Sequence, residues 1–197
     1  MAETGTTAGQ DSGQDSGQDV GTGSASVPAG EPDNRYGEDG VAEPGWPRVR
    51  GELEKAPLFW LTTVRPDGRP HVTPLIGVWA DGSLFFCTGA HERKAKNLAE
   101  NQHCVLTTGT NELNSGLDIV LEGDAIRVRD TARLQWIADG YEEKYGSIWH
   151  FDVHEDVFWQ QDNNGGHDAL VFEVAPVTVF GFGKGPYSQT KYRFDGA

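Results

Sequence analysis

Short apolar runs separated by turn residues dominate the chain from residue 58 onward. Residues 58–64 form an apolar run rich in β-formers, and the turn Pro66-Asp67-Gly68 follows it. Asp81-Gly82 separates the next two runs and is the strongest hairpin signal in the chain. The pattern therefore predicts three antiparallel strands in a row, at residues 58–64, 71–79 and 83–88.

Helical spacing of apolar residues replaces this pattern in three places. Residues 48–55 predict a short helix that Pro57 ends, and residues 91–101 predict a second. The clearest helical period runs to Tyr145, with Asp130 as N-cap and Gly146 as C-terminal stop. A polar loop is expected over residues 147–168, and further strands at 103–108, 118–128, 169–174 and 177–182, the last two joined at Pro176. Strands with helices inserted between them predict a closed or half-closed antiparallel barrel.

Residues 1–45 differ in composition from the rest of the chain. They repeat Gly-Gln-Asp-Ser, lack Leu, Ile, Phe and Trp, and carry nine acidic side chains against the single Arg35. Such a segment cannot bury enough apolar area to offset its ordering entropy. We therefore expect a disordered acidic tail over residues 1–45, a folded domain over 46–183 and a C-terminal extension over 184–197.

The net charge narrows the possible partners and compartment. A total of −14, of which residues 1–45 carry −8, argues against nucleic acid and against anionic membranes. There is neither an apolar stretch of about 18 residues nor a secretory signal pattern, so we expect a cytoplasmic protein. Cys87 and Cys104 match no CxxC spacing and are expected to be buried apolar residues.

A cluster of cations stands where the second helix is expected to begin. Free backbone N–H groups and the helix dipole favour anions there, yet Arg93, Lys94 and Lys96 occupy the first turns. Together with the hydroxyl of Thr88, these groups would make a clamp for a phosphate or carboxylate. The alternative is a solvated basic face balanced by the two neighbouring acidic residues, Glu92 and Glu100.

Pairs of threonines end two of the expected strands, Thr62-Thr63 and Thr107-Thr108. Their hydroxyls and backbone amides would suit the polar edge of a flat heterocycle, whose face an aromatic side chain covers. The aromatic candidates for this role are Trp60, Trp79 and Phe86. The alternative is that threonine is simply a good strand former.

Two apparent motifs do not complete a site. The glycines of residues 181–185 are followed by Pro186 rather than a helix, which excludes a dinucleotide fingerprint. His150 and His154-Glu155 resemble part of a zinc-protease motif, but Phe158 stands at its last position, so we expect no metal site. Because no acid–base pair stands out either, an enzyme of this sequence would need a cofactor to supply its chemistry.

Residues 50–183 resemble the flavin and deazaflavin oxidoreductases of the split β-barrel superfamily, the group labelled pyridoxamine 5′-phosphate oxidase-like. The matching motifs are Leu61-Thr62-Thr63, Asp67-Gly68-Arg69-Pro70-His71-Val72-Thr73-Pro74, Thr88-Gly89, Arg93-Lys94-Ala95-Lys96-Asn97-Leu98 and Glu122-Gly123-Asp124-Ala125. Residues 181–184 and 189–194 resemble the tail of an actinobacterial branch of this group.

The resemblance implies a mostly β fold with inserted helices, an antiparallel, Greek-key-like, FMN-binding-type split β-barrel that forms a homodimer with two cofactor clefts at its interface. By this resemblance Arg93 and Lys94 bind the phosphate or acidic tail of the cofactor, while Thr62 and the Leu75–Gly77 backbone line its ring. The cofactor-binding candidates are Thr62, Thr63, Leu75, Ile76, Gly77, Trp79, Thr88, Arg93, Lys94, Lys96, Asn97, Lys191 and Arg193.

Aromatic and cationic residues near the C-terminus are typical of interface centres. We expect them to cross to the partner subunit and edge its cofactor cleft. They are Trp159, Tyr187, Lys191, Tyr192 and Arg193.

The resemblance implies a redox enzyme that moves a hydride between its cofactor and a small unsaturated or aromatic substrate. The cofactor would be deazaflavin coenzyme F420, whose long acidic tail suits the cations of residues 93–96, or FMN. A non-catalytic flavin or haem carrier is the alternative from another class. A pyridoxamine 5′-phosphate oxidase is a further alternative, but residues 70–86 lack the Lys or Arg of its second phosphate pair and the chain ends Arg193-Phe194-Asp195-Gly196-Ala197 instead of in its Arg-Leu-x-Pro tail.

Overall fold

The computed structural model describes residues 1, 27–33, 35–38, 40–161 and 165–194. In chain order its elements are β1 (Gly30–Pro32), α1 (Trp46–Lys55), β2 (Phe59–Val64), β3 (Pro70–Leu75), β4 (Val78–Ala80), β5 (Ser83–Thr88), α2 (Arg93–Glu100), β6 (His103–Thr108), β7 (Gly116–Arg127), α3 (Thr131–Tyr145), a 3₁₀ helix (Ser147–Trp149), β8 (Asp152–His154), β9 (Val157–Gln160), β10 (His167–Lys184) and β11 (Ser188–Arg193).

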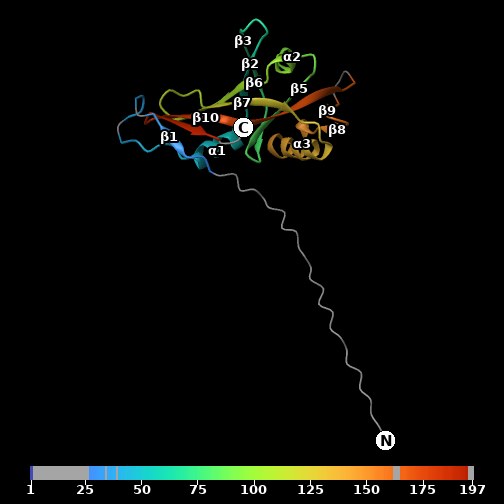
Figure 1. Cartoon of the computed structure of the whole chain (residues 1–197), viewed down its shortest axis with the longest axis horizontal. Coiled ribbons are helices and arrows are strands. Elements are labelled where there is room, and N and C mark those ends of the chain that lie inside the picture. The colour runs from blue at the N-terminus through green and yellow to red at the C-terminus, as the bar shows by residue number, and fades with distance from the viewer. Residues whose placement is uncertain (2–26, 34, 39, 162–164, 195–197) are drawn as a thin grey trace.

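One antiparallel sheet organises these strands around β10, which crosses the molecule in Figure 1. The main path runs β1-β11-β10-β7-β6-β2-β3. The first half of β10 pairs with β5 as well as β7, and its second half pairs with β7 and β11. The pairing with β7 shifts register between Pro176 and Thr178, where the second neighbour of β10 changes from β5 to β11. The expected mostly β split barrel is confirmed.

The three strands predicted in a row are instead two separate hairpins. β3 pairs with β2, whereas β4 pairs with β5, and β5 continues the sheet to β10. The chain leaves its strand at Ile76-Gly77 between the two hairpins. A Cβ on Gly77 would lie 3.0 Å from the carbonyl oxygen of Phe85 in β5 and 3.3 Å from the ring of Phe59 in β2, so the close packing of this connection against both strands depends on a residue without a side chain. β3 thereby becomes an edge, and the β2–β3 hairpin projects from the body in Figure 1.

The end of the chain is more regular than its polar pattern suggested. The expected loop over residues 147–168 contains a 3₁₀ helix and the β8–β9 hairpin, and β9 pairs with the start of β10. The two strands predicted on either side of Pro176 form the single strand β10, because the register shift accommodates the proline without ending the strand.

Part of the segment expected to lack structure is a strand. Gly30–Pro32 forms β1, which pairs with β11, so the prediction of disorder over residues 1–45 is wrong for these residues. Residues 2–26 lie outside the described part of the chain. The expected extension over residues 184–197 is not separate either, because β10 reaches Lys184 and β11 returns along it. β1 thus covers an edge of β11 that would otherwise be open.

Two apolar clusters fill the two ends of the fold. The larger lies inside the barrel beneath α1, with Trp46 packed against Trp79 and Tyr192. The smaller lies beneath α3, with Tyr141 among its fully buried residues. α3 follows the sequence prediction closely: the Asp130 carboxylate accepts a hydrogen bond of 2.8 Å from the Arg133 amide, and Gly146 ends the helix with φ of 82°. Among the described residues no helix has the length and apolarity to cross a bilayer.

Candidate functional site: a polar cradle at the start of α2

The polar groups of the site begin where β5 ends and α2 starts. Thr88 closes β5, and α2 begins five residues later at Arg93, with Glu92 as its N-cap residue. The turn between them is fixed by a hydrogen bond of 3.1 Å from the Glu92 amide to the Gly89 carbonyl. The first turn of α2 contains no acidic residue. Of the three cations predicted to form a clamp here, Lys94 is buried at the helix start, whereas Arg93 and Lys96 are exposed.

The Glu92 carboxylate lies in the middle of these groups. It accepts hydrogen bonds from Thr88 Oγ1 at 2.9 Å, from the Gly89 amide at 3.0 Å and from Lys94 Nζ. Burial alone would raise the pKa of Glu92, but the hydrogen bonds from Lys94, Thr88 and Gly89 outweigh it and lower the pKa of this carboxyl. Glu92 therefore balances the charge of Lys94. The Lys94 side chain is only 10% exposed, so it is not part of a solvated basic face.

A second group of polar side chains lies on the inner face of the adjoining strands. Asn97, 1% exposed, donates from Nδ2 to Thr63 Oγ1 at 2.9 Å, and Thr63 stands opposite His71 in the β2–β3 ladder. Within the described residues, Asn97 Oδ1, His71 Nδ1 and Thr73 Oγ1 are buried without a hydrogen-bond partner. Burial lowers the pKa of His71, and the positive charges of nearby Arg65, Lys94 and Arg93 add to this effect.

We call these residues the α2 cradle: Thr63, His71, Thr73, Thr88, Glu92, Lys94 and Asn97. Its ammonium, hydroxyl and amide donors suit an oxyanion, and its buried atoms without partners suit hydroxyl groups, which both donate and accept. The ribityl phosphate portion common to FMN and F420 has this combination. The residues present therefore fit such a cofactor, on the condition that Glu92 gives up the donors it now holds.

Thr62 lies on the opposite face of β2 from Thr63, because successive side chains of a strand alternate. It borders a hollow of about 490 Å³ on the outside of the sheet. The residues that line this outer hollow are Thr62, Val64, His103, Cys104, Val105, Glu122, Gly123, Asp124 and Val177. The two threonines expected to act together are thus separated by the sheet.

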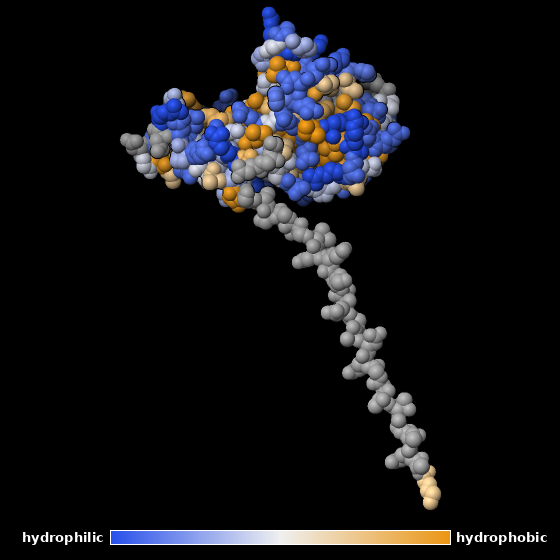
Figure 2. All heavy atoms as spheres, in the orientation of Figure 1, coloured by the Kyte–Doolittle hydropathy of each residue, from blue (hydrophilic) through white to orange (hydrophobic). Residues whose placement is uncertain are grey.

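The outer hollow belongs to a wider apolar surface, which we call the outer face. Cross-strand pairs place Trp60, Thr107, Val120 and Phe180 in one row across β2, β6, β7 and β10. Trp60 is 48% exposed, Val72 53% and Val177 42%. Figure 2 shows hydrophobic residues at the surface among hydrophilic ones in the middle of the body.

The Leu75–Gly77 connection is held from α3. Tyr145 Oη donates to the Gly77 carbonyl at 2.8 Å and accepts from the Gly77 amide at 3.1 Å. Lys144 Nζ donates to the same carbonyl at 2.8 Å, and burial lowers the pKa of Lys144 to about 8. The sequence analysis missed both side chains, because they lie 67 and 68 residues from Gly77 and no local motif links them.

The aromatic candidates have different surroundings. Phe86 is fully buried and stacks on Phe172 in the core. Trp79 is buried against Trp46 and lines a cavity of about 590 Å³ beneath α3. Trp60 alone among the three is widely exposed, on the outer face. Thr108, expected at a ring edge, donates instead to the Leu58 carbonyl at 2.9 Å.

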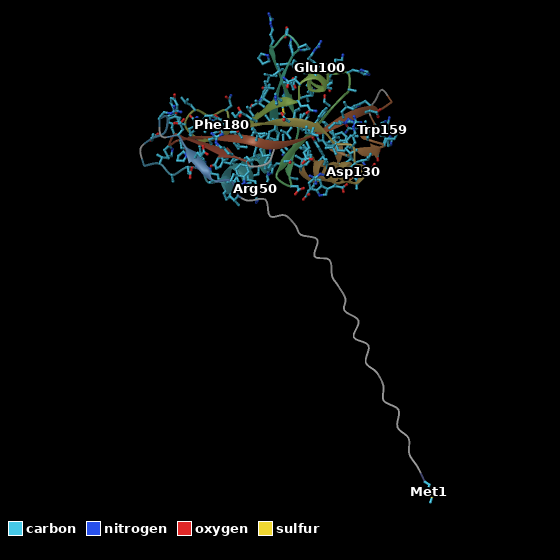
Figure 3. All side chains as sticks on the ribbon, in the orientation of Figure 1. Met1, Arg50, Glu100, Asp130, Trp159 and Phe180 are labelled. Carbon is cyan, nitrogen blue, oxygen red and sulfur yellow. The ribbon has the colours of Figure 1, made fainter. Side chains whose placement is uncertain are left out.

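The C-terminal candidates also separate. Lys191 Nζ lies 5.5 Å from the centre of the Phe180 ring on the outer face, and Arg193 Nε lies 3.2 Å from the Glu31 carboxylate. Tyr192 is 1% exposed in the core of its own chain and donates to the Pro44 carbonyl, so the expectation that it crosses to a partner is wrong. Figure 3 labels Phe180 and Trp159 toward opposite sides of the molecule, so these late residues do not form one group.

The two cysteines are free thiols. Cys104 is buried as expected, whereas Cys87 is half-buried. The two histidines of the apparent zinc motif contact different residues. His150 pairs with Glu142 at 2.7 Å, whereas His154 stacks on Trp159. Within the described residues no group of three or more His, Cys, Asp or Glu could hold a metal ion.

The antiparallel strand order, with β10 shared between the two halves of the sheet, defines this protein as a split β-barrel. The chain belongs to the pyridoxamine 5′-phosphate oxidase family, whose model matches residues 46–182. No curated protein sequence matches it.

Solved structures with the same fold come from several bacteria. A conserved hypothetical protein from Mycobacterium tuberculosis has a TM-score of 0.58 at 16% identity, covering 75% of this chain and 89% of that one. A putative 5-nitroimidazole antibiotic resistance protein from Bacteroides thetaiotaomicron has a TM-score of 0.56 at 14% identity, covering 85% and 93%. A heme binding protein from Mycobacterium smegmatis has a TM-score of 0.57 at 13% identity, covering 76% and 59%. At these identities the likeness concerns the fold.

Proposed function

We propose that this protein is a homodimeric oxidoreductase that uses F420 or FMN to transfer a hydride to or from a small unsaturated or aromatic substrate. The observation that carries the proposal is the α2 cradle, which combines donors for an oxyanion with buried polar atoms that lack partners. The bound cofactor supplies the hydride chemistry. The residues of the chain supply binding and orientation.

Each part of the site has a role in this proposal. Lys94, Thr88 and the Gly89 amide bind the phosphate, while the inner face of β2 and β3 contacts the hydroxyls. The Leu75–Gly77 segment would border the ring, and Tyr145 and Lys144 keep that segment in one conformation by bonding to the Gly77 backbone. A fixed backbone of this kind positions the reacting carbon, which is most of what hydride transfer requires of a protein.

The deazaflavin is the favoured cofactor, and the distribution of cations supports this choice. Arg93 and Lys96 are both exposed and lie three residues apart, on one face of α2. A long acidic tail would run along this face beyond the phosphate. Residues 70–86 contain no Lys or Arg that would form the second phosphate pair of a pyridoxamine 5′-phosphate oxidase.

In this proposal the two copies of the homodimer contact each other through the outer face. An apolar surface of this extent, with Trp60, Val72 and Val177 exposed, is typical of an interaction site. A second copy would cover it. We also propose a cytoplasmic location.

A non-catalytic carrier is the second candidate, since one neighbour in fold is described as a heme binding protein. Mass spectrometry and absorption spectra of the protein purified from its native host, followed by turnover assays with enones and nitroaromatics, distinguish the two. The proposal expects F420 or FMN and more than one turnover per cofactor. Bound haem, or a bound flavin that supports no multiple turnover, would contradict it in favour of the carrier.

A further inference from the structure

The Glu92 side chain occupies the place that the phosphate requires. Its two oxygens receive the Thr88 hydroxyl, the Gly89 amide and the Lys94 ammonium, all from residues within four positions along the chain. A carboxylate and a phosphate oxygen are equivalent acceptors for such donors. The cradle therefore contains an anion of its own.

The chemistry of the neighbouring groups prevents both anions from using the cradle together. Lys94 is nearly buried, so its ammonium has little access to water and a single carboxylate balances its charge. A phosphate placed beside an ionised Glu92 would face a like charge at close range. The Glu92 side chain is 52% exposed, which leaves it room to rotate toward solvent.

We propose that Glu92 is a specificity-determining residue that acts as an internal competitor: its carboxylate closes the cradle and must be displaced by the cofactor phosphate. This inference rests on the proposed function. A small anion gains only the three donors and cannot outweigh the loss of the Glu92 contacts. A phosphate attached to a ribityl chain and a ring gains further contacts, for example with Asn97, whose buried Oδ1 has no partner among the described residues. Glu92 thus keeps the site free of inorganic phosphate and admits a ligand that binds at several points.

The first test uses inorganic phosphate as the probe. Full-length Glu92→Gln, which keeps the shape but removes the charge, is expected to bind phosphate at least tenfold more tightly than wild type in ³¹P NMR titrations, corresponding to about 1.4 kcal/mol. Glu92→Ala, which frees all three donors, is expected to gain at least as much. Glu100→Gln is the matched control, because it removes the same charge at the other end of α2, where Figure 3 labels Glu100.

The inference is overturned if neither Glu92 variant binds phosphate more tightly than Glu100→Gln, with thermal melting used to verify that each variant is folded. That result would show Glu92 to be a structural element of the turn. A parallel titration with FMN isolates the proposed function: Lys94→Met is expected to weaken FMN binding at least tenfold. If Lys94→Met binds FMN as well as wild type while Glu92→Gln gains phosphate affinity, the cofactor assignment fails and the role of Glu92 stands.

Discussion

The α2 cradle and the outer hollow lie on opposite faces of β2 and differ in chemistry. The cradle is polar, its principal charges are paired within residues 88–94, and it is made by one chain. The hollow combines three valines, Val64, Val105 and Val177, with polar side chains at its border, and is open on the outside of the sheet. The difference suggests two separable roles. The cradle of a single chain would bind the anion, whereas the outer face would be covered by a second copy of the chain. Substitutions should therefore affect one task without the other.

The largest expected effect is on the outer face. Val177→Asp would place a charge at the proposed dimer contact, and an uncompensated buried charge costs about 3–5 kcal/mol. With two such charges per dimer we expect dimer affinity to fall more than a thousandfold, giving a monomer in light scattering at micromolar concentration. Leu113→Asp is the control, since Leu113 is 76% exposed outside this face. A wild-type monomer, or a Val177→Asp dimer, would contradict the division of tasks.

The second expected effect is on the cradle. Replacing Arg93 and Lys94 by Ala removes two charge-assisted contacts of about 1.5–3 kcal/mol each, so FMN or F420 affinity should fall at least a hundredfold. The apo-protein should also melt lower, because Glu92 loses the ammonium that it contacts. Arg93→Ala alone should leave the apo melting temperature unchanged or raise it, since a cation at a helix start opposes the dipole by about 0.3–1 kcal/mol.

Fluorescence titration and thermal melting on the same samples measure both quantities, and light scattering should still give a dimer. Unchanged cofactor affinity in the double variant would remove the cradle from the binding site.

The third expected effect concerns the floor of the hollow. A Cβ on Gly123 would lie 2.5 Å from the Ala175 carbonyl oxygen, so Gly123→Ala must push β7 away from β10. We expect a loss of about 1–3 kcal/mol in the free energy of unfolding, measured by urea denaturation. Gly51→Ala in α1 is the control: no atom lies within 4 Å of its Cβ, and the change should stabilise the helix by about 0.5–1 kcal/mol. Equal effects of the two variants would argue against close contact between β7 and β10.

The smallest expected effect is on thiol reactivity, with one cysteine near each region. Burial raises the pKa of Cys87, beside the cradle, and of Cys104, on the hollow, to about 12. Because the thiolate is the reactive form, both should react slowly with a disulfide reagent at pH 8, and the rate should rise about tenfold per pH unit while the fold persists. Both should react at once in denaturant. A fast native phase from either cysteine would show that its region opens in solution.

The sequence predicted the contiguous parts of the site better than the distant ones. Residues 88–97 carry their own turn, helix start and charges, so the cluster could be identified from its order in the chain. The separation of Thr62 from Thr63 also follows from strand alternation, a signal that was present but not used. The role of Glu92 was less accessible, because only side-chain geometry shows that it accepts from all three donors.

The parts that could not be predicted depend on contacts across the fold. Nothing near Gly77 indicates that Tyr145 holds both its N–H and its carbonyl. Likewise, the three residues of β1 have no strand pattern of their own and are ordered by pairing with β11. In both cases the tertiary partner, rather than the local sequence, determines the conformation.

The position of β10 has a consequence for how the protein is made. This strand joins β5, β7, β9 and β11, yet it begins at residue 167 of 197. During synthesis the ribosome therefore releases β5 and β7 well before the strand that pairs with both has emerged. Their open edges and apolar faces are exposed in the nascent chain for that interval, which is when such chains aggregate or recruit chaperones. A truncation that removes only the last sixth of the chain would leave the barrel without its central strand.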